Sequence, residues 1–179
     1  MKSKIFLAIL LLTPLIVLLT STLSFQSGFS PKYTKNNGVF FSEYFNATNL
    51  GLVDDSDALK FDDGKWLFAT YASNDADLKK ALYLMRQLNI ALNRDIYKLK
   101  RVIFTQDRSP ISDQLIDYPR TQTIIDSEGK LFENLIKFSD EKFFLEQKFF
   151  IIDPYGRAVM FFPVSMDAKL ILKDLKILI

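Results

Sequence analysis

The residues best suited to chemistry stand together at the start of an amphipathic stretch, where Asn74 and Asp75 are followed by Asp77. Two carboxylates at this spacing could bind a hard metal ion or act as an acid/base pair. The same residue types also cap helices. The Asn74 carbonyl oxygen would accept a hydrogen bond from the amide of Asp77, and carboxylates in a first turn complement the helix dipole. No other carboxylate is fixed nearby by the sequence, so we expect a cap, worth about 1 kcal/mol.

The composition excludes most other chemistry. The sequence contains no cysteine and no histidine. It therefore has no disulfide, no thiol redox centre, no imidazole base, no Ser-His triad and no ordinary zinc or copper ligand set. The net charge is +2 with both signs interspersed, and no basic stripe of the kind that binds nucleic acid stands out. We expect no catalytic residue, no metal, no cofactor and no nucleic-acid partner.

Three consecutive runs must position the Asn74–Asp77 segment. Residues 64–71 are short, apolar and rich in β-formers, and a second strand is predicted over 101–105. Between them the sequence repeats at helical spacing, which predicts an amphipathic helix. A strand, a helix and a strand in this order predict a βαβ unit with parallel strands and a right-handed crossover. The apolar face of the helix consists of Leu78, Ala81, Leu82, Met85, Leu88 and Leu92.

Before and just after this unit, the pattern is weaker. Residues 38–41 predict a short strand at a sheet edge, and residues 59–61 predict another extended piece. The stretch 106–126 carries two prolines and predicts a long irregular connection. A short helix is predicted from Ser127 onward, with its apolar face at Leu131, Phe132, Leu135 and Ile136.

The last part of the chain predicts a hairpin and a final helix. Strands are predicted over 149–152 and 158–162, joined by a β-turn at 153–156 in which proline and glycine set the backbone. Ser165 or Asp167 would cap the last helix. The complete order predicts an α/β fold of the thioredoxin type: a three-layer α/β/α domain with a central mixed sheet over residues 38–179.

The amino-terminal segment predicts a membrane anchor. Residues 5–19 are almost wholly apolar, the low-polarity stretch reaches residue 25, and two lysines precede it. This length suits a transmembrane helix over residues 1–25, with a cleaved signal peptide as the alternative. The positive flank places the folded part on the far side, so we expect a single-pass protein of the inner membrane with a periplasmic domain. Residues 26–37 predict a polar linker.

Several exposed side chains are candidates for partner contact. Arg86 and Gln87 lie on the polar side of the predicted helix, and Tyr155 lies at the tip of the predicted hairpin. Asp75 and Asp77 belong to the same set if they are not engaged in capping. Two further groups have simpler interpretations. We expect a solvated edge from the basic cluster Arg94, Lys98, Lys100 and Arg101. We expect mostly core positions, with one or two exposed rings, from Phe138, Phe143, Phe144, Phe149 and Phe150.

Four sequence motifs together resemble a known family. They are Gly64-Lys65-Trp66-Leu67, the helical Ala-Leu-Tyr-Leu-Met-Arg-Gln of residues 81–87, the hairpin Ile-Asp-Pro-Tyr-Gly of residues 152–156, and Lys-Asp-Leu-Lys of residues 173–176. From about residue 37 onward, the chain resembles small membrane-anchored thioredoxin-like proteins of proteobacteria. These proteins are encoded with cytochrome c oxidase assembly factors and are distant relatives of the SCO/SenC copper chaperones.

The chain departs from this family at its chemical centre. The resemblance places the two cysteines of the family's C-x-x-x-C motif at Asn74 and Leu78, and the histidine of the family has no counterpart. An amide and an isobutyl group supply no thiolate for copper(I).

The resemblance implies a non-catalytic accessory role in assembly or stability of a cytochrome oxidase, with oxidase subunits or assembly factors as partners. Two alternatives remain: a thioredoxin-fold enzyme of peroxiredoxin type, and a small-ligand or hard-metal binding module using Asp75, Asp77 and the Asp153 loop.

Overall fold

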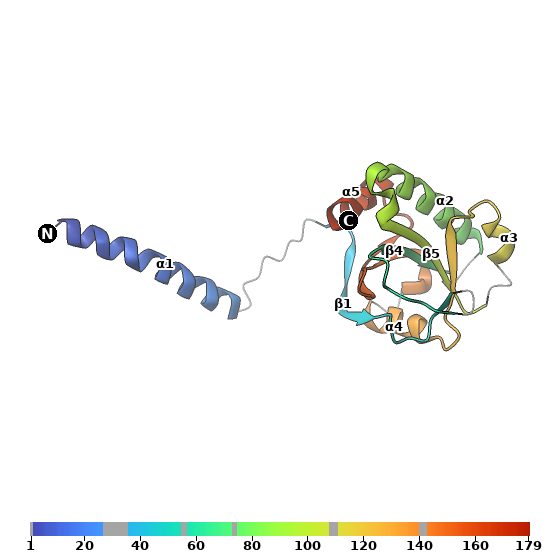
Figure 1. Cartoon of the computed structure of the whole chain (residues 1–179), viewed down its shortest axis with the longest axis horizontal. Coiled ribbons are helices and arrows are strands. Elements are labelled where there is room, and N and C mark those ends of the chain that lie inside the picture. Colours follow the sequence, from blue (N-terminus) through green and yellow to red (C-terminus); the bar gives the residue numbers. More distant parts are fainter. Residues whose placement is uncertain (1, 27–35, 55–56, 73–74, 108–110, 140–142) are drawn as a thin grey trace. The chain divides into compact units, whose positions relative to one another are not determined.

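A computed structural model describes residues 2–26, 36–54, 57–72, 75–107, 111–139 and 143–179 (Figure 1). The chain divides into two units, Met1–Lys35 and Asn36–Ile179. The first contains one helix, α1 (Lys2–Gln26), with Pro14 inside it. Across the described part of the chain, no helix meets the length and apolarity required to cross a membrane. The predicted helix is therefore present, but its transmembrane character is not confirmed.

The second unit is built on a mixed sheet of eight strands in the order β1-β8-β7-β4-β5-β6-β2-β3. Strands β4 and β5 pair in parallel, as do β5 and β6, and every other pair is antiparallel. The strands are β1 (Val39–Asn46), β2 (Val53–Asp54), β3 (Asp57–Ala58), β4 (Trp66–Tyr71), β5 (Leu99–Thr105), β6 (Thr121–Ile125), β7 (Lys148–Ile152) and β8 (Arg157–Pro163). The predicted βαβ unit and hairpin are confirmed.

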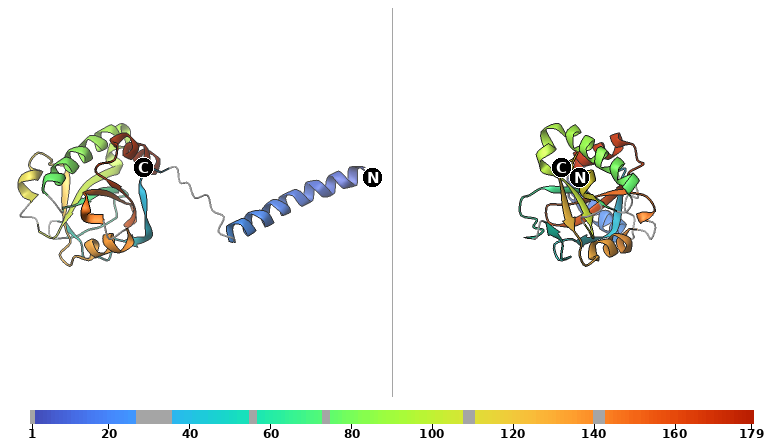
Figure 2. Two further views of the ribbon diagram at one scale, coloured as in Figure 1. Left: turned by 180° about the vertical axis from the view of Figure 1, so that it is seen from behind. Right: turned by 90° about the vertical axis from the view of Figure 1, so that its right-hand side faces the viewer.

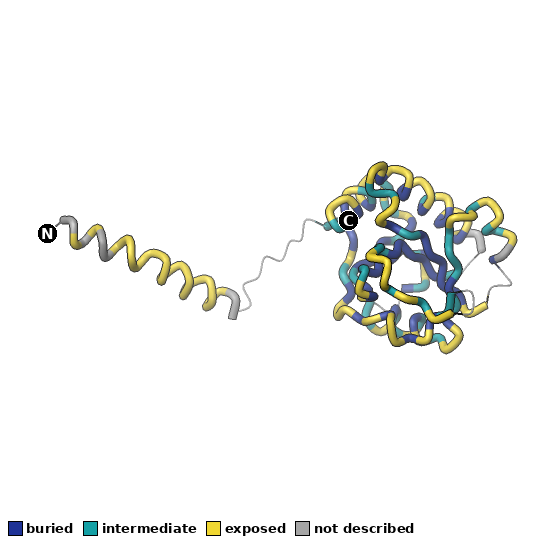
Figure 3. The backbone as a smooth tube through the Cα atoms, in the orientation of Figure 1, coloured by how far each residue is buried: buried dark blue, intermediate teal, exposed yellow. Residues whose placement is uncertain are grey.

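Helices cover both faces of the sheet. On one face, α2 (Asp75–Ala91) and α5 (Ala168–Leu178) pack over buried side chains of β4, β7 and β8 (Figures 1 and 2). On the other face, α4 (Lys130–Phe138) contacts β1. Its Leu131 and Leu135 are buried in the hydrophobic core on that side of the sheet. The buried backbone lies between these helices (Figure 3). All six predicted apolar positions are buried, five of them in α2 and the sixth, Leu92, directly after it, which confirms the inward face.

Two predictions about the middle of the chain are wrong. Residues 59–61 form no strand; the extension occurs earlier, in β2 and β3, and the Leu59 amide donates to the Leu52 carbonyl at 2.8 Å beyond the β2–β3 pair. The stretch 106–126 is not irregular throughout, because it contains α3 (Ser112–Leu115) and the strand β6. The sequence of β6 shows little alternation of apolar and polar residues, so it does not predict a strand. The strand forms because it pairs in parallel with β5.

The start of α4 and the phenylalanines also differ from expectation. Helix α4 begins at Lys130, three residues after the predicted start, because Gly129 adopts the left-handed conformation (φ 68°) ahead of it. None of the five phenylalanines of residues 138–150 is exposed, because each ring packs against other aromatic rings of the core. Leu145 is the exposed apolar residue in that stretch, at 80%. Asp167 caps α5, its carboxylate accepting from the Lys169 amide at 2.9 Å.

Candidate functional site: the α2 helix and an arginine cleft beside it

The amino-terminal end of α2 is the place where the resemblance puts a redox or copper centre. Asn74 lies outside the described residues, so its predicted cap does too. Asp75 opens α2, and Asp77, two residues further on in the first turn, is exposed. Leu78 is only 1% exposed and packs with Leu82, Ile103 and Ile111 in a cluster of its own. The second cysteine position is thus occupied by a core side chain.

The residues present do not fit copper. Copper(I) prefers soft thiolate and thioether ligands, and Leu78 offers a hydrocarbon surface that is already packed against its neighbours. The printed sequence contains no cysteine or histidine that could replace it. We derive no chemistry through a copper ion.

The Asp153 loop, the other candidate for a hard metal, has its carboxylate engaged. Asp153 Oδ1 accepts from the backbone amides of Tyr155 and Arg157, both at 2.9 Å. Asp153 Oδ2 accepts from Arg157 Nε at 2.6 Å. These bonds hold the β7–β8 turn, which makes Asp153 a structural residue. Among the described residues, no group of three or more acidic, cysteine or histidine side chains could hold a metal ion.

The predicted contact residues divide between two elements. Arg86 and Gln87 are exposed on α2, whereas Tyr155 is 73% exposed in the β7–β8 turn. The Arg157 guanidinium lies 5.4 Å from the centre of the Tyr155 ring and holds it in place from one side. Of these three, Arg86 lines a cavity.

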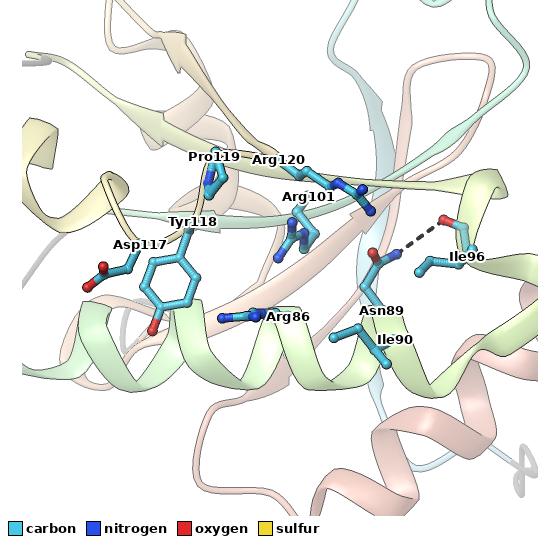
Figure 4. Close-up of a pocket in the computed structure, with 9 residues that line it drawn as sticks. All are labelled: Arg86, Asn89, Ile90, Ile96, Arg101, Asp117, Tyr118, Pro119 and Arg120. Atoms are coloured by element: carbon cyan, nitrogen blue, oxygen red, sulfur yellow. Dashed lines mark hydrogen bonds between the residues drawn. The ribbon is translucent and has the colours of Figure 1, made fainter.

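That cavity is a cleft of about 350 Å³ between α2, β5 and the segment that leads into β6. Figure 4 shows Arg86 projecting from α2, Arg101 from β5 and Arg120 from the segment that leads into β6. We call this the arginine cleft. Its lining consists of Arg86, Asn89, Ile90, Ile96, Arg101, Asp117, Tyr118, Pro119 and Arg120.

Arg101 is the most unusual side chain of the cleft. It is 7% exposed, and its Nη1 atom is fully buried without a hydrogen-bond partner. Burial lowers the pKa of Arg101 from its ordinary value, and the positive charges of Arg86 and Arg120 lower it further. In the part of the chain that the structure describes, no carboxylate pairs with any of the three guanidinium groups. The cleft therefore concentrates uncompensated positive charge.

Asn89 fixes the back of the cleft. Its side-chain amide donates to the carbonyls of Ile96 at 3.3 Å and Leu99 at 3.2 Å (Figure 4 draws the first). These bonds hold the 3₁₀ turn η1 (Asn93–Lys98) against α2, with Asn93 at φ 56° to reverse the chain. The cleft is thus lined by rigid elements. A second cavity of about 340 Å³ shares Asn89, Ile96, Arg101 and Arg120 with it and extends toward Lys65 and Gln122.

The prediction of a solvated basic edge is wrong for Arg101. Lys98 pairs with Asp95 at 2.8 Å, and Lys100 with Asp63 at 2.5 Å, so both are ordinary surface pairs. Arg101 is buried because it lies inside β5, whose two faces are both covered. The sequence did carry a signal: an arginine directly before Val102-Ile103-Phe104, a run typical of a strand covered on both faces, has no solvated side to occupy.

Comparison with solved structures supports the fold. The chain matches BsSco, a member of the Sco family of cytochrome c oxidase assembly proteins, at a TM-score of 0.50 and 13% identity, covering 82% of this chain and 96% of that one. It matches Xylella fastidiosa PrxQ at a TM-score of 0.50 and 16% identity, over 81% and 98%. It matches the bacterioferritin comigratory protein of Xanthomonas campestris at a TM-score of 0.50 and 17% identity, over 73% and 91%. At these identities the likeness concerns the fold alone.

Comparison by sequence gives the family. No curated protein sequence matches the chain significantly. A family model does match, over residues 66–179, from the first residue of β4 to the end of the chain. Because this match covers more than half of the sequence, the chain belongs to the family described as the transmembrane-like, thioredoxin-like, C-terminal domain.

Proposed function

We propose that this protein is a non-catalytic accessory factor in the assembly or stability of a respiratory cytochrome oxidase, and that it acts by protein contact. The observation that carries the proposal is Leu78, a fully packed core leucine at the position where the resemblance expects a cysteine. A thioredoxin fold with leucine at this position lacks a thiol for disulfide exchange or copper binding. Its function would then depend on contacts that its surface makes with other proteins. The partner class comes from the likeness to BsSco, a member of a family of cytochrome c oxidase assembly proteins.

The proposal includes a tether to the inner membrane with the folded unit on the periplasmic side. Its support is α1, whose described leucines, isoleucines and valine are exposed, and the two lysines that precede the apolar run. Apolar side chains displayed around a whole helix favour a lipid environment. Alkaline extraction of membranes should leave the protein in the pellet, and protease added to spheroplasts should digest the folded unit. Release into the soluble fraction would contradict the tether.

Affinity purification tests the contact role. Full-length protein from mild-detergent membranes should bring oxidase subunits or their haem and copper assembly factors with it. Tyr155→Ala removes an exposed ring at the hairpin tip and should reduce recovery. Tyr44→Ala, at a similarly exposed tyrosine of β1, is the matched control and should leave recovery unchanged. Absence of respiratory proteins from the wild-type sample would refute the contact role.

A peroxide assay tests the enzymatic alternative of peroxiredoxin type. The likeness to Xylella fastidiosa PrxQ supplies the reason to measure it. Peroxide reduction of that kind needs a reactive thiolate, which this sequence cannot supply. We expect no peroxide consumption above the protein-free rate with a dithiol reductant present. Turnover that scales with protein concentration would favour the enzyme.

A further inference from the structure

We propose that the arginine cleft binds the phosphoryl group of a small phosphorylated ligand. This inference does not depend on the oxidase role. The cleft lies along the carboxy-terminal half of α2, beside β5 and the approach to β6, and none of its residues belongs to the motif in which the family carries cysteines.

The first step is the missing counter-charge. Buried guanidinium groups in folded proteins are ordinarily paired and hydrogen-bonded, because desolvation of an unpaired ion is costly. Arg101 breaks this rule with a buried, unpartnered Nη1 atom, and two more arginines enter the same space. Burial lowers the pKa of Arg101, and the positive charges of Arg86 and Arg120 lower it further, so these neighbours add to the cost of the buried charge. A ligand that brings negative charge would remove the cost.

The second step is the kind of anion. Guanidinium groups bind phosphate and carboxylate oxygens through paired donors. A carboxylate offers two oxygens and a single charge, too little for three arginines from three segments. A phosphoryl group offers three oxygens and up to two charges. Asp117, the acidic residue of the lining, is exposed and has no ion pair with the arginines in the described structure. Its charge lowers but does not cancel the positive potential.

The third step is the rest of the ligand. A cleft of about 350 Å³ is at the lower end of the size of small-molecule sites, which leaves room beside one phosphoryl group. Tyr118, Pro119, Ile90 and Ile96 supply an apolar wall for an organic moiety. Arg86 and Arg120 are exposed while Arg101 is buried, so the open side of the cleft carries two solvent-accessible arginines and its floor a buried one. The same chemistry suits a soluble phosphomonoester or a phospholipid headgroup.

Calorimetric titration tests the site on the full-length protein in nonionic detergent at low ionic strength. Inorganic phosphate and pyrophosphate are the soluble probes. Saturable binding is expected, weakened at least tenfold by Arg86→Gln or Arg120→Gln, because each variant removes one charge-assisted hydrogen bond to the phosphoryl group. Arg94→Gln, at an exposed arginine outside the cleft, should leave affinity unchanged. Equal loss in Arg94→Gln, or no saturable binding to any probe, would overturn the proposal.

Micelles that contain phosphatidic acid, with phosphatidylcholine micelles as the control, distinguish a soluble phosphomonoester from a phospholipid headgroup as the source of the phosphoryl group. Binding of soluble probes assigns a small molecule, and binding only to phosphatidic acid assigns a headgroup; both support a phosphoryl site if Arg86→Gln weakens them.

The melting temperature of the unliganded protein gives an independent readout. Arg101→Met keeps an unbranched side chain that fills the space of the arginine's aliphatic stem and removes the buried charge, so it should raise the melting temperature by about 2–4 °C while it abolishes probe binding. A structural arginine would behave in the opposite way. A lower melting temperature in Arg101→Met, with probe affinity retained, would therefore refute the assignment.

Discussion

At the scale of single residues, buried polar groups join the elements of the domain to one another. Asp126 is fully buried and accepts three hydrogen bonds: from the Tyr71 hydroxyl at 3.1 Å, the Leu131 amide at 3.3 Å and the Phe132 amide at 3.0 Å. It therefore caps α4 from outside the helix and joins it to β4. One carboxylate satisfies donors from two elements that would otherwise be buried without partners.

Replacement of Asp126 by alanine should destabilise the protein. The change leaves the Tyr71 hydroxyl and two helix amides without acceptors, which should lower the free energy of unfolding by about 2–4 kcal/mol. Urea unfolding followed by circular dichroism measures this. Asp57→Ala, at an exposed aspartate of β3, is the control and should change stability by less than about 0.5 kcal/mol. If Asp126→Ala and Asp57→Ala were equally stable, the hydrogen bonds of Asp126 would make no measurable contribution to the free energy of unfolding.

The Tyr71–Asp126 pair also predicts a pH dependence. Burial raises the pKa of Tyr71 well above its ordinary value, and the neighbouring Asp126 carboxylate adds to the rise. A raised pKa in the folded state means that stability is fully present below the unfolded pKa, near 10, and falls as the pH rises above it. Between pH 9 and about 11.5, wild type should lose stability more steeply than Tyr71→Phe, by up to about 1.4 kcal/mol per pH unit. Parallel curves for the two proteins would mean that Tyr71 titrates normally.

At the scale of elements, two faces of α2 have different roles: one packs against the sheet, and the other lines the arginine cleft. Its apolar face anchors it to the sheet through Leu78, Leu82 and the residues that follow at helical spacing. Arg86 lies on another face and turns toward β5 and the approach to β6 (Figure 4). The first half of the helix, which in the family resemblance would carry a thiol, here contributes packing.

Truncation of Leu78 tests this structural role. Leu78→Ala leaves a cavity between α2 and Ile103 and should cost about 2–5 kcal/mol of unfolding free energy. Leu170→Ala, at a partly exposed leucine of α5, should cost much less. Chemical denaturation midpoints compare the two. If the Leu78→Ala variant were as stable as wild type, the Leu78 side chain would not contribute to the packing of the core.

At the scale of the whole folded unit, its first and last elements are joined by one carboxylate. Asp174 of α5 is buried and accepts from the Asn37 amide at 2.6 Å, the Asn37 side chain at 2.8 Å and the Gly38 amide at 2.8 Å. The edge strand β1 begins at the next residue. Edge strands fray most easily, so a fixed start limits local opening of the sheet.

Loss of this link should act locally. Asp174→Ala should speed amide hydrogen exchange in β1 and the start of α5, and lower global stability by about 1–3 kcal/mol. Lys173→Ala, at the exposed neighbour, is the control. Hydrogen exchange with mass spectrometry locates the effect. Faster exchange spread evenly over all eight strands would show that Asp174 supports the core rather than the edge.

The sequence by itself determined the elements with strong periodicity and the chemistry that is missing. The apolar face of α2, the β4–α2–β5 unit and the β7–β8 hairpin follow from patterns within one segment, since each buries side chains at a fixed local spacing. The absence of cysteine and histidine is likewise a property of composition.

Tertiary structure alone decided the start of α4, strand β6 and the arginine cleft. Helix α4 starts where Asp126 can reach its amides, and β6 exists because β5 offers a parallel partner. The cleft needs Arg86, Arg101 and Arg120, which come from three separate segments and meet only when α2 crosses beside β5. Arg101 illustrates the reason: its residue type favours solvent, but its position in a strand covered on both faces places it inside. Burial depends on which surfaces the fold brings together, and local sequence does not contain that information.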